Sequence, residues 1–521
     1  MSPPRMIPCM SSVPATPTEP DDDARYLALK TRDARFDGRF FTGVTSTGIY
    51  CRPVCSVKTP KRENCRFFSH AAQAEHAGFR PCLRCRPELA PHSVLWSIQD
   101  ASYILAHQAA RLLDEPEAWT GIRGDDTPSA CKLATRLGVS DRHVRRIFEA
   151  QFGVSPMQYL QTRRLLTAKQ LLADTCLPIT QIALASGFSS VRRFNSAFAD
   201  HYGLNPTAMR RQADPPAGRG ICVRLGYRPP YDAAAMLAFF SRRAIDSMEA
   251  VSIDAGKPWL RRTLRVEAGG RVYKGWLAVE FDAARSQVLL QVGDSLRDVL
   301  PLVIRRTRAA FDLDADPQAI NALLGTDFPG SEGLRVPGTL DGYELAVRAV
   351  LGQQITVAAG RTLAQRLVHT LGEPVATPWN ELYRLFPSPQ ALASADPDLL
   401  GSLGIVRQRQ AAITGIARAV AGKNVQLHGG ADVNATIAAL KELPGIGDWT
   451  AQYIAMRALR WPDAFPAGDV ALHNAMGVRG LKNPAREADA RSLAWQPWRS
   501  YAVIRCWSGL LRPAEPALPL E

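Results

Sequence analysis

The chain has 521 residues, 46% of them hydrophobic and 21% charged, so it is long enough for three or four domains that each bury their own core. No run of eighteen apolar residues occurs, and the first twenty residues are rich in Pro, Ser and Thr, so we expect neither a membrane span nor a signal peptide. We therefore predict a cytoplasmic protein with no membrane partner, in which ten cysteines favour a metal site over a disulfide framework.

The formal net charge of +14 is concentrated in two segments. Residues 30–88 contain twelve Lys and Arg against five Asp and Glu, and residues 136–211 contain eleven against four. Two basic segments on an otherwise balanced chain predict two contacts with nucleic acid. The alternative is that the charge only confers solubility.

Residues 1–24 are predicted to be a disordered leader, followed by a first domain at 25–92. Two closely spaced cysteine pairs lie in that domain: Cys51, Cys55, Cys82 and Cys85. Four thiolates in two short-spaced pairs are typical of a tetrahedral zinc site, so we expect one Zn²⁺. By residue type alone, a purely structural zinc is the commoner explanation.

The residues around these cysteines point to one family. The segments TGIYCRPVC, RENCRFF and AGFRPCLRCRP resemble the amino-terminal zinc domain of Ada-type proteins, with the same gap between the cysteine pairs. The resemblance implies that Cys51 is a zinc-bound thiolate that accepts a methyl group from a DNA methylphosphotriester, once per molecule. Cys65 falls where no ligand is expected, and we interpret it as a small buried residue.

Residues 93–211 contain an amphipathic helix at 93–115 and then two helix-turn-helix patterns. The first, KLATRLGVSDRHVRRIFEAQFG, has Gly138 at the turn and Ser140 as the expected N-cap. The second, ITQIALASGFSSVRRFNSAFADHYG, repeats it with Gly187 and Ser189. The predicted recognition helices present basic side chains, namely Arg142, Arg145 and Arg146 in the first and Arg192 and Arg193 in the second.

A single pattern of this kind is more often a charged, solvated helix face, but two in tandem are a stronger signal. With GVSPMQYLQTRRL and GLNPTAMRR, the segment resembles the AraC-type DNA-binding domain. That family places two recognition helices in successive major grooves, which implies promoter DNA and RNA polymerase as partners.

Residues 212–220, QADPPAGRG, have the composition of a linker. The next segment, 221–305, contains strand-like stretches at TLRVEA, YKGWLAVEF and QVLLQVG and is predicted to be a small α+β domain. It resembles the amino-terminal domain of AlkA-type glycosylases, including an opening PPYD. No chemistry follows from its residues.

Residues 306–512 have a helical pattern, with a short tail at 513–521, and the resemblance to AlkA-type enzymes continues through WRSYAVIRCW. By that resemblance, GYELAVRAVLGQQITVAAGRTLAQRLV supplies the loop that inserts into DNA when a base leaves the stack. Gln354 stands where these enzymes can place a leucine wedge, a departure that leaves the identity of the wedge open.

The stretch LPGIGDWTAQYIAMRALRWPDAFPAGD is predicted to be helix, hairpin, helix. Gly445 and Gly447 permit positive φ and let backbone N–H groups approach a phosphate. Asp469, by residue type, is most often a helix N-cap. The stretch resembles the helix-hairpin-helix DNA glycosylases, and this assigns base excision to Asp469, a role compatible with capping.

Three aromatic residues line the base pocket by the same resemblance: Trp449, Tyr453 and Trp507. Residue spacing alone favours a core role for Trp449 and Tyr453, which lie four apart on one helical face. Bifunctional members of the superfamily carry a lysine at the position of Trp449, so no Schiff base is expected here. Near the carboxyl end Cys506 is the only cysteine, so no iron–sulfur cluster is expected either.

The predicted fold is multidomain and mainly α: a small four-cysteine zinc α/β domain, an all-α tandem helix-turn-helix domain, an α+β domain and an all-α helix-hairpin-helix glycosylase domain. The predicted function is a monofunctional glycosylase for alkylated bases of the 3-methyladenine type, fused to a regulatory half that senses methylphosphotriesters and binds double-stranded DNA. The alternative is a methylation-activated transcription regulator whose glycosylase fold serves only to bind DNA.

Overall fold

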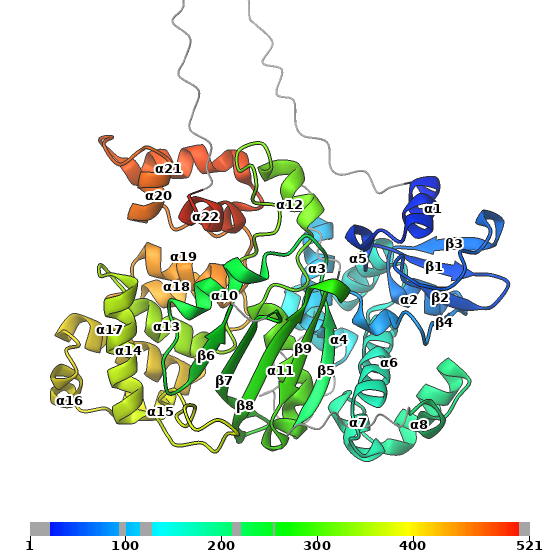
Figure 1. The fold of residues 1–521 in the computed structure, drawn as a ribbon, viewed down its shortest axis with the longest axis horizontal. Coiled ribbons are helices and arrows are strands. Elements are labelled where there is room, and N and C mark those ends of the chain that lie inside the picture. The colour runs from blue at the N-terminus through cyan, green and yellow to red at the C-terminus, as the bar shows by residue number, and fades with distance from the viewer. Residues whose placement is uncertain (1–20, 93–100, 115–127, 211–219, 254–255, 510–521) are drawn as a thin grey trace, which may run out of the picture.

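A computed structural model describes residues 21–92, 101–114, 128–210, 220–253 and 256–509. A five-stranded sheet lies in the middle of the molecule, with a helical domain on one side and a smaller sheet and the helix-turn-helix region on the other (Figure 1). Most of the predicted leader and linker and all of the predicted tail lie outside the described residues. The first helix begins at Asp22, inside the predicted leader, because the Asp21 side chain caps it through the amide of Ala24.

The amino-terminal domain is a four-stranded sheet flanked by two short helices. The strands occur in the order β3-β1-β2-β4, with β2 and β4 parallel and the other pairs antiparallel. The elements are α1 Asp22–Thr31, β1 Phe41–Val44, β2 Ile49–Cys51, β3 Cys65–Phe68, α2 Ala71–His76 and β4 Arg80–Pro81.

The next region is helical throughout. Its helices are α3 Ala101–Asp114, α4 Ala130–Leu137, α5 Asp141–Phe152, α6 Pro156–Asp174, α7 Ile179–Ala185, α8 Val191–Tyr202 and α9 Pro206–Met209. The helix predicted at 93–115 is described only as α3, because its ends fall outside the described residues. Two helix-turn-helix units, α4–α5 and α7–α8, are joined by the long helix α6, which confirms the tandem arrangement.

The central domain is an antiparallel sheet in the order β5-β9-β8-β7-β6. Its elements are β5 Ile221–Gly226, α10 Ala233–Ser241, β6 Glu249–Ser252, β7 Trp259–Ala268, β8 Arg271–Asp282, β9 Gln287–Val292 and α11 Leu300–Ala310. The three predicted strands lie in β7, β8 and β9. Two further strands, β5 and β6, were not predicted, since they are short edge strands that tertiary pairing stabilises.

The carboxyl-terminal domain is helical, as predicted. Its helices are α12 Pro317–Leu324, α13 Gly342–Leu351, α14 Val357–Leu371, α15 Pro389–Ala393, α16 Pro397–Ser402, α17 Arg407–Ala421, α18 Val433–Lys441, α19 Asp448–Arg457, α20 Val470–Ala475, α21 Pro484–Ser492 and α22 Arg499–Trp507. Their apolar faces share one core, which includes Leu351, Ile413, Ile454 and Val503.

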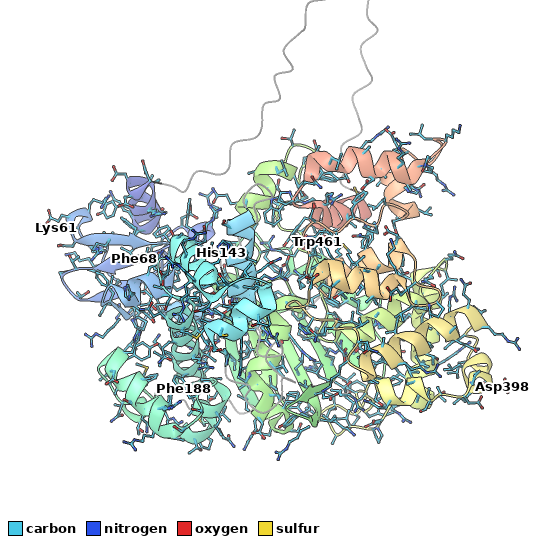
Figure 2. All side chains as sticks on the ribbon, turned by 180° about the vertical axis from the view of Figure 1, so that it is seen from behind. Lys61, Phe68, His143, Phe188, Asp398 and Trp461 are labelled. Carbon is cyan, nitrogen blue, oxygen red and sulfur yellow. The ribbon has the colours of Figure 1, made fainter. Side chains whose placement is uncertain are left out.

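The two halves of the chain, residues 21–210 and residues 220–509, pack against each other. The apolar core of α6, α7 and α8 is continuous with that of the central sheet, so the second helix-turn-helix unit rests on the carboxyl-terminal half. In the rear view of Figure 2, Lys61 in the amino-terminal domain and Asp398 in α16 mark opposite ends of the molecule. Among the described residues, no helix has the length and apolar character needed to span a membrane.

Candidate catalytic and zinc sites

The four predicted zinc ligands meet at one end of the small sheet. Cys51 ends β2, and the parallel pairing of β2 with β4 brings the second cysteine pair alongside the first. The sulfur atoms of all four cysteines lie within 4.8 Å of one another. Tetrahedral Zn–S bonds place sulfur atoms about 3.8 Å apart, so the quartet fits one zinc ion. Cys65 is buried, lies outside the quartet and donates its thiol to the Lys61 carbonyl, in accord with its predicted role.

A buried arginine supports this cluster. The Arg52 amide donates to Sγ of Cys85 over 3.3 Å, and the guanidinium donates to the Cys85 carbonyl and to the Asp37 carboxylate. Arg52 and Asp37 are both buried, so each neutralises the other's charge in a dry environment. The metal site is thereby tied to Asp37, which the sequence motif did not reveal.

A backbone amide reaches one sulfur atom of the quartet, since the Arg52 amide donates to Sγ of Cys85. An N–H···S hydrogen bond withdraws charge from a thiolate and lowers its nucleophilicity. Cys85 is made less reactive in this way.

The two recognition helices display their basic residues. Gly138 ends α4 with φ +68°, and Ser140 caps α5 by accepting from the His143 amide, as predicted. Arg142, Arg145 and Arg146 are exposed on α5. Arg145 forms an i,i+4 ion pair with Asp141.

In the second unit the cap differs by one residue. Gly187 has φ +84°, but α8 is capped by Ser190 rather than Ser189. Ser189 instead accepts from Arg193 at 3.4 Å. Arg192 and Arg193 are exposed, so both units present cations on the helix expected to enter a major groove.

The hairpin between α18 and α19 uses its two glycines differently. Gly445 has φ +78°, and a Cβ there would lie 3.1 Å from that of Ala412, so a left-handed turn and close packing both require glycine. Gly447 does not use the positive φ that glycine permits: its φ is −91° and it is the extended N-cap of α19. A Cβ at Gly447 would meet nothing within 4 Å, so its absence leaves the start of α19 open to approach.

Asp469 caps α20 and also lies at the centre of the predicted base pocket. Its Oδ1 accepts from the Leu472 amide at 2.9 Å and from Nε1 of Trp507 at 3.1 Å. Its Oδ2 accepts from Nε1 of Trp449 at 2.9 Å. Three N–H groups therefore fix the orientation of one carboxylate.

The aromatic residues form one cluster beside that carboxylate. The rings of Trp449 and Tyr453 are stacked, with centroids 5.3 Å apart and an interplanar angle of 13°. The ring centroid of Trp507 lies 6.2 Å from that of Tyr453. Tyr453 is buried, whereas both tryptophans are half-buried and reach solvent. The structure thus brings together all three predicted pocket residues and Asp469.

Charged groups near the pocket shift the pKa values of the Tyr453 hydroxyl and the Cys506 thiol. Burial by itself raises the pKa of Tyr453, but the neighbouring guanidinium groups of Arg457 and Arg243 outweigh it and lower the pKa. Burial and the nearby Asp469 carboxylate raise the pKa of Cys506 to about 12, so this thiol stays protonated.

The candidate insertion loop lies between α13 and α14. Gln354 is exposed at its tip with φ +56°, a left-handed conformation that is strained for a residue with a Cβ. The preceding residue was not singled out by the sequence: Nε2 of Gln353 donates to the Gly445 carbonyl at 3.0 Å and to the Thr450 hydroxyl at 2.8 Å. Gln353 therefore joins the loop to the hairpin.

A cavity of about 1640 Å³ lies elsewhere, between the two halves of the chain. His92, Arg163, Asp314 and Arg460 are among its lining residues, whereas Asp469 and the three aromatic residues are not. The candidate excision site is therefore distinguished by its converging carboxylate, aromatic rings and hairpin, and not by the size of a cavity.

Four family models match the chain in succession. They are the metal binding domain of Ada at residues 24–88, a helix-turn-helix domain at 133–212, the AlkA N-terminal domain at 222–341 and the HhH-GPD superfamily of base excision DNA repair proteins at 347–500.

A protein of Mycobacterium tuberculosis named "Probable bifunctional transcriptional activator/DNA repair enzyme AlkA" is 37% identical over 514 residues, which cover 96% of this chain and 99% of that protein. The chain belongs to this bifunctional family. DNA-3-methyladenine glycosylase 2 of Escherichia coli is 33% identical over 54% of this chain and 95% of its own. The bifunctional activator and repair enzyme Ada of the same species is 35% identical over 39% of this chain and 51% of its own.

The family membership confirms the predicted fusion. An Ada-type metal-binding and DNA-binding part precedes an AlkA-type base-excision part in one chain.

Proposed function

We propose that this protein is a monofunctional glycosylase that hydrolyses the N-glycosidic bond of alkylated bases, with Asp469 as the catalytic carboxylate. The observation that carries the proposal is the convergence of Trp449 and Trp507 on the Asp469 carboxylate. Two aromatic walls and one negative charge then form a single unit, which suits a flipped cationic base attached to a sugar that becomes cationic.

The reaction follows from these groups. A methylated purine of the 3-methyladenine type carries positive charge, and each aromatic face contributes about 0.5–2 kcal/mol of cation–π attraction once desolvated. When the glycosidic bond breaks, its electron pair leaves with the base and neutralises that charge. Asp469 stabilises the positive charge that develops at C1′, and a water molecule then adds there and loses a proton.

We further propose that the insertion loop and the hairpin hold the DNA around this pocket. The exposed position and left-handed backbone of Gln354 support a wedge role. The open N-terminus of α19 behind Gly445 and Gly447 supports contact with a phosphate.

The zinc site supports a second activity, irreversible methyl transfer to Cys51. In this step the Cys51 thiolate attacks the methyl carbon of a phosphotriester, the C–O bond breaks, and its electron pair stays on the phosphate oxygen. The products are a phosphodiester and a methyl thioether. The Arg52 amide on the sulfur of Cys85 disfavours that ligand as the acceptor, and the resemblance to Ada-type proteins supports Cys51.

Methylation also raises the charge of the zinc domain by one unit and so strengthens its attraction to DNA. We propose that this change directs the exposed arginines of α5 and α8 to promoter DNA. RNA polymerase as a partner and a cytoplasmic location belong to the same proposal.

Incubating the intact protein with methylated duplex DNA tests the main proposal. We expect release of free 3-methyladenine without strand cleavage in the same tube. Tight DNA binding without any base release would contradict this function and favour the alternative regulator in which the glycosylase fold only binds DNA.

A further inference from the structure

One buried arginine joins the two halves of the chain. Arg228 follows β5, its side chain is among the largest that are fully buried, and its relative exposure is 1%. Its guanidinium donates to five backbone carbonyls, those of Asp37, Pro91, His92, Asp314 and Ala315. A guanidinium has five N–H groups, so every donor of Arg228 is used.

The first group of acceptors belongs to the amino-terminal domain. Nε of Arg228 donates to the Asp37 carbonyl at 2.7 Å. The carboxylate of the same Asp37 holds Arg52, whose amide donates to the zinc-ligand sulfur of Cys85. A continuous set of hydrogen bonds therefore runs from the zinc site to Arg228.

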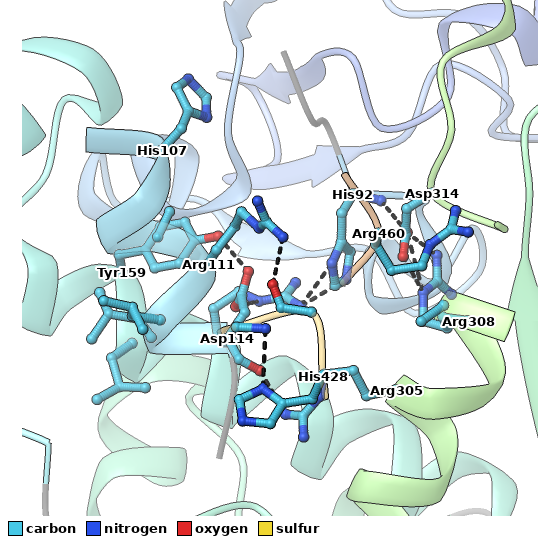
Figure 3. A pocket seen from close by; sticks show the side chains of 18 of the residues that line it. His92, His107, Arg111, Asp114, Tyr159, Arg305, Arg308, Asp314, His428 and Arg460 are labelled. Carbon is cyan, nitrogen blue, oxygen red and sulfur yellow. Dashed lines mark hydrogen bonds and ion pairs between the residues drawn. The ribbon is translucent and has the colours of Figure 1, made fainter. Parts of the chain in front are cut away.

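The second group of acceptors lies in the segment between α11 and α12. Nη1 of Arg228 donates to Asp314 at 2.8 Å and to Ala315 at 3.1 Å. The Asp314 carboxylate accepts from the His92 amide at 2.8 Å and from Arg308, so side-chain and main-chain contacts fasten the same segment to both halves. Figure 3 shows His92, Asp314 and Arg308 linked in this way, with Arg460 close by.

The same segment holds the helices that carry the base pocket. Asp312 is buried, and its carboxylate accepts from the Tyr501 hydroxyl at 2.9 Å and from Arg460. Tyr501 lies in α22, which ends in Trp507, and Arg460 lies three residues after the end of α19, which carries Trp449 and Tyr453. Asp312 thus connects the two helices whose tryptophans meet at Asp469.

We propose that Arg228 is a positioning residue for base excision and that, through it, the zinc domain is a structural part of the glycosylase. The zinc domain and Arg228 together immobilise residues 312–316, and this segment fixes the relative placement of α19 and α22. Loss of the zinc ion or of the Arg228 hydrogen bonds loosens the pocket, although the excision chemistry itself uses no metal. This inference rests on the proposed glycosylase function.

The first test is the full-length Arg228→Lys variant, which keeps the charge but cannot satisfy five carbonyls. Loss of one or two hydrogen bonds at the junction predicts about a tenfold slower single-turnover base release at saturating DNA, with less than about a twofold change in DNA affinity. Arg224→Lys is the matched control, because Arg224 also joins the two halves, through Asp174, but is more than half exposed and does not contact residues 312–316. We expect its release rate to equal that of the wild type.

A merely structural role would lower thermal stability without changing the rate of the folded protein. Release is therefore measured at a temperature where circular dichroism shows each variant folded. Hydrogen–deuterium exchange then follows α19 and α22, which we expect to exchange faster in Arg228→Lys and not in Arg224→Lys. An unchanged release rate in folded Arg228→Lys would overturn the inference.

The second test removes zinc from the wild type and from Arg228→Lys. We expect chelation to slow release by the wild type and to speed exchange at residues 312–316, with little further effect in the variant, because both changes act through the same contacts. A wild-type rate and exchange pattern that do not respond to zinc would overturn the inference and leave the proposed function intact. If the zinc-loaded wild type releases no base, the proposed function fails first and this inference fails with it.

Discussion

The indole Nε1 of Trp449 lies 2.9 Å from Oδ2 of Asp469, so a wall of the base pocket and its carboxylate are held in one hydrogen-bonded unit. Trp507 reaches the other oxygen of the same carboxylate from a different helix. A carboxylate held by preorganised donors requires little reorganisation when charge develops in the transition state. Substitutions that remove this charge or these hydrogen bonds should therefore slow base release strongly.

Asp469→Asn should abolish most base release and leave the fold intact. Asparagine is as good an N-cap as aspartate, so α20 should persist, but a neutral amide cannot stabilise a cationic sugar. We expect the single-turnover rate to fall about 10²–10³-fold. The variant should unfold at nearly the same temperature and bind DNA normally. A variant with wild-type release would remove Asp469 from the mechanism.

Trp449→Phe should keep an aromatic face and lose the N–H that orients Asp469. A hydrogen bond to a charged group contributes about 1.5–3 kcal/mol, so we expect about a 10- to 100-fold slower release. Trp495→Phe is the matched control, since Trp495 donates to Asp327 at 2.8 Å in the same domain and away from the pocket. Equal losses in the two variants would mean that stability and not orientation causes the effect.

Gln353→Ala should separate the insertion loop from the hairpin. The substitution removes donors to the Gly445 carbonyl and the Thr450 hydroxyl, and two hydrogen bonds of about 1 kcal/mol each predict up to a 30-fold weaker base release from duplex DNA. The loss should be smaller for a lesion in single-stranded DNA, where no base pair has to be opened.

Gln365→Ala serves as its control, because Gln365 lies in α14, outside the loop, and makes one exposed hydrogen bond to Asp246. An identical loss on duplex and single-stranded substrates would contradict a role for Gln353 in inserting the loop.

Cys51→Ala should abolish methyl transfer, whereas Cys65→Ala should not. Cys51 belongs to the sulfur quartet, and Cys65 is buried outside it. After incubation with DNA that carries methylphosphotriesters, mass spectrometry should show one added methyl group on the wild type and on Cys65→Ala. A methyl group on Cys55, Cys82 or Cys85 in the wild type would contradict the assignment.

Stability should fall in mild acid, because three histidines are held neutral. Burial lowers the pKa of His70, His92 and His107 from 6.5 to about 4. Between these values the unfolded chain binds protons that the folded chain does not, so the free energy of unfolding decreases as the pH falls. The slope is at most about 4 kcal/mol per pH unit for three protons. Urea unfolding from pH 7 to 4 measures it, and a flat profile above pH 5 would contradict it.

The local motifs could be predicted from sequence because they depend on short-range spacing. A serine before a basic helix, a Pro-Gly-Ile-Gly hairpin and an aspartate before an apolar helix each restrict the nearby backbone. In the structure Ser140 caps α5, Gly445 takes the left-handed conformation, and Asp469 caps α20. Gly447 shows the limit of such reasoning, since glycine permits a positive φ without requiring it.

The sequence alone determined the order of domains, the zinc quartet and the candidate catalytic residues. Spacing suffices for the two cysteine pairs, whereas the roles of Cys51 and Asp469 followed from the resemblance to known families. Only the tertiary structure decided that Trp449 and Trp507 donate to one carboxylate, that Gln353 ties the loop to the hairpin, and that Arg228 joins five carbonyls from both halves. Each of these contacts joins residues far apart in the chain. Such pairings depend on how helices and sheets pack, and no periodicity or local spacing encodes them.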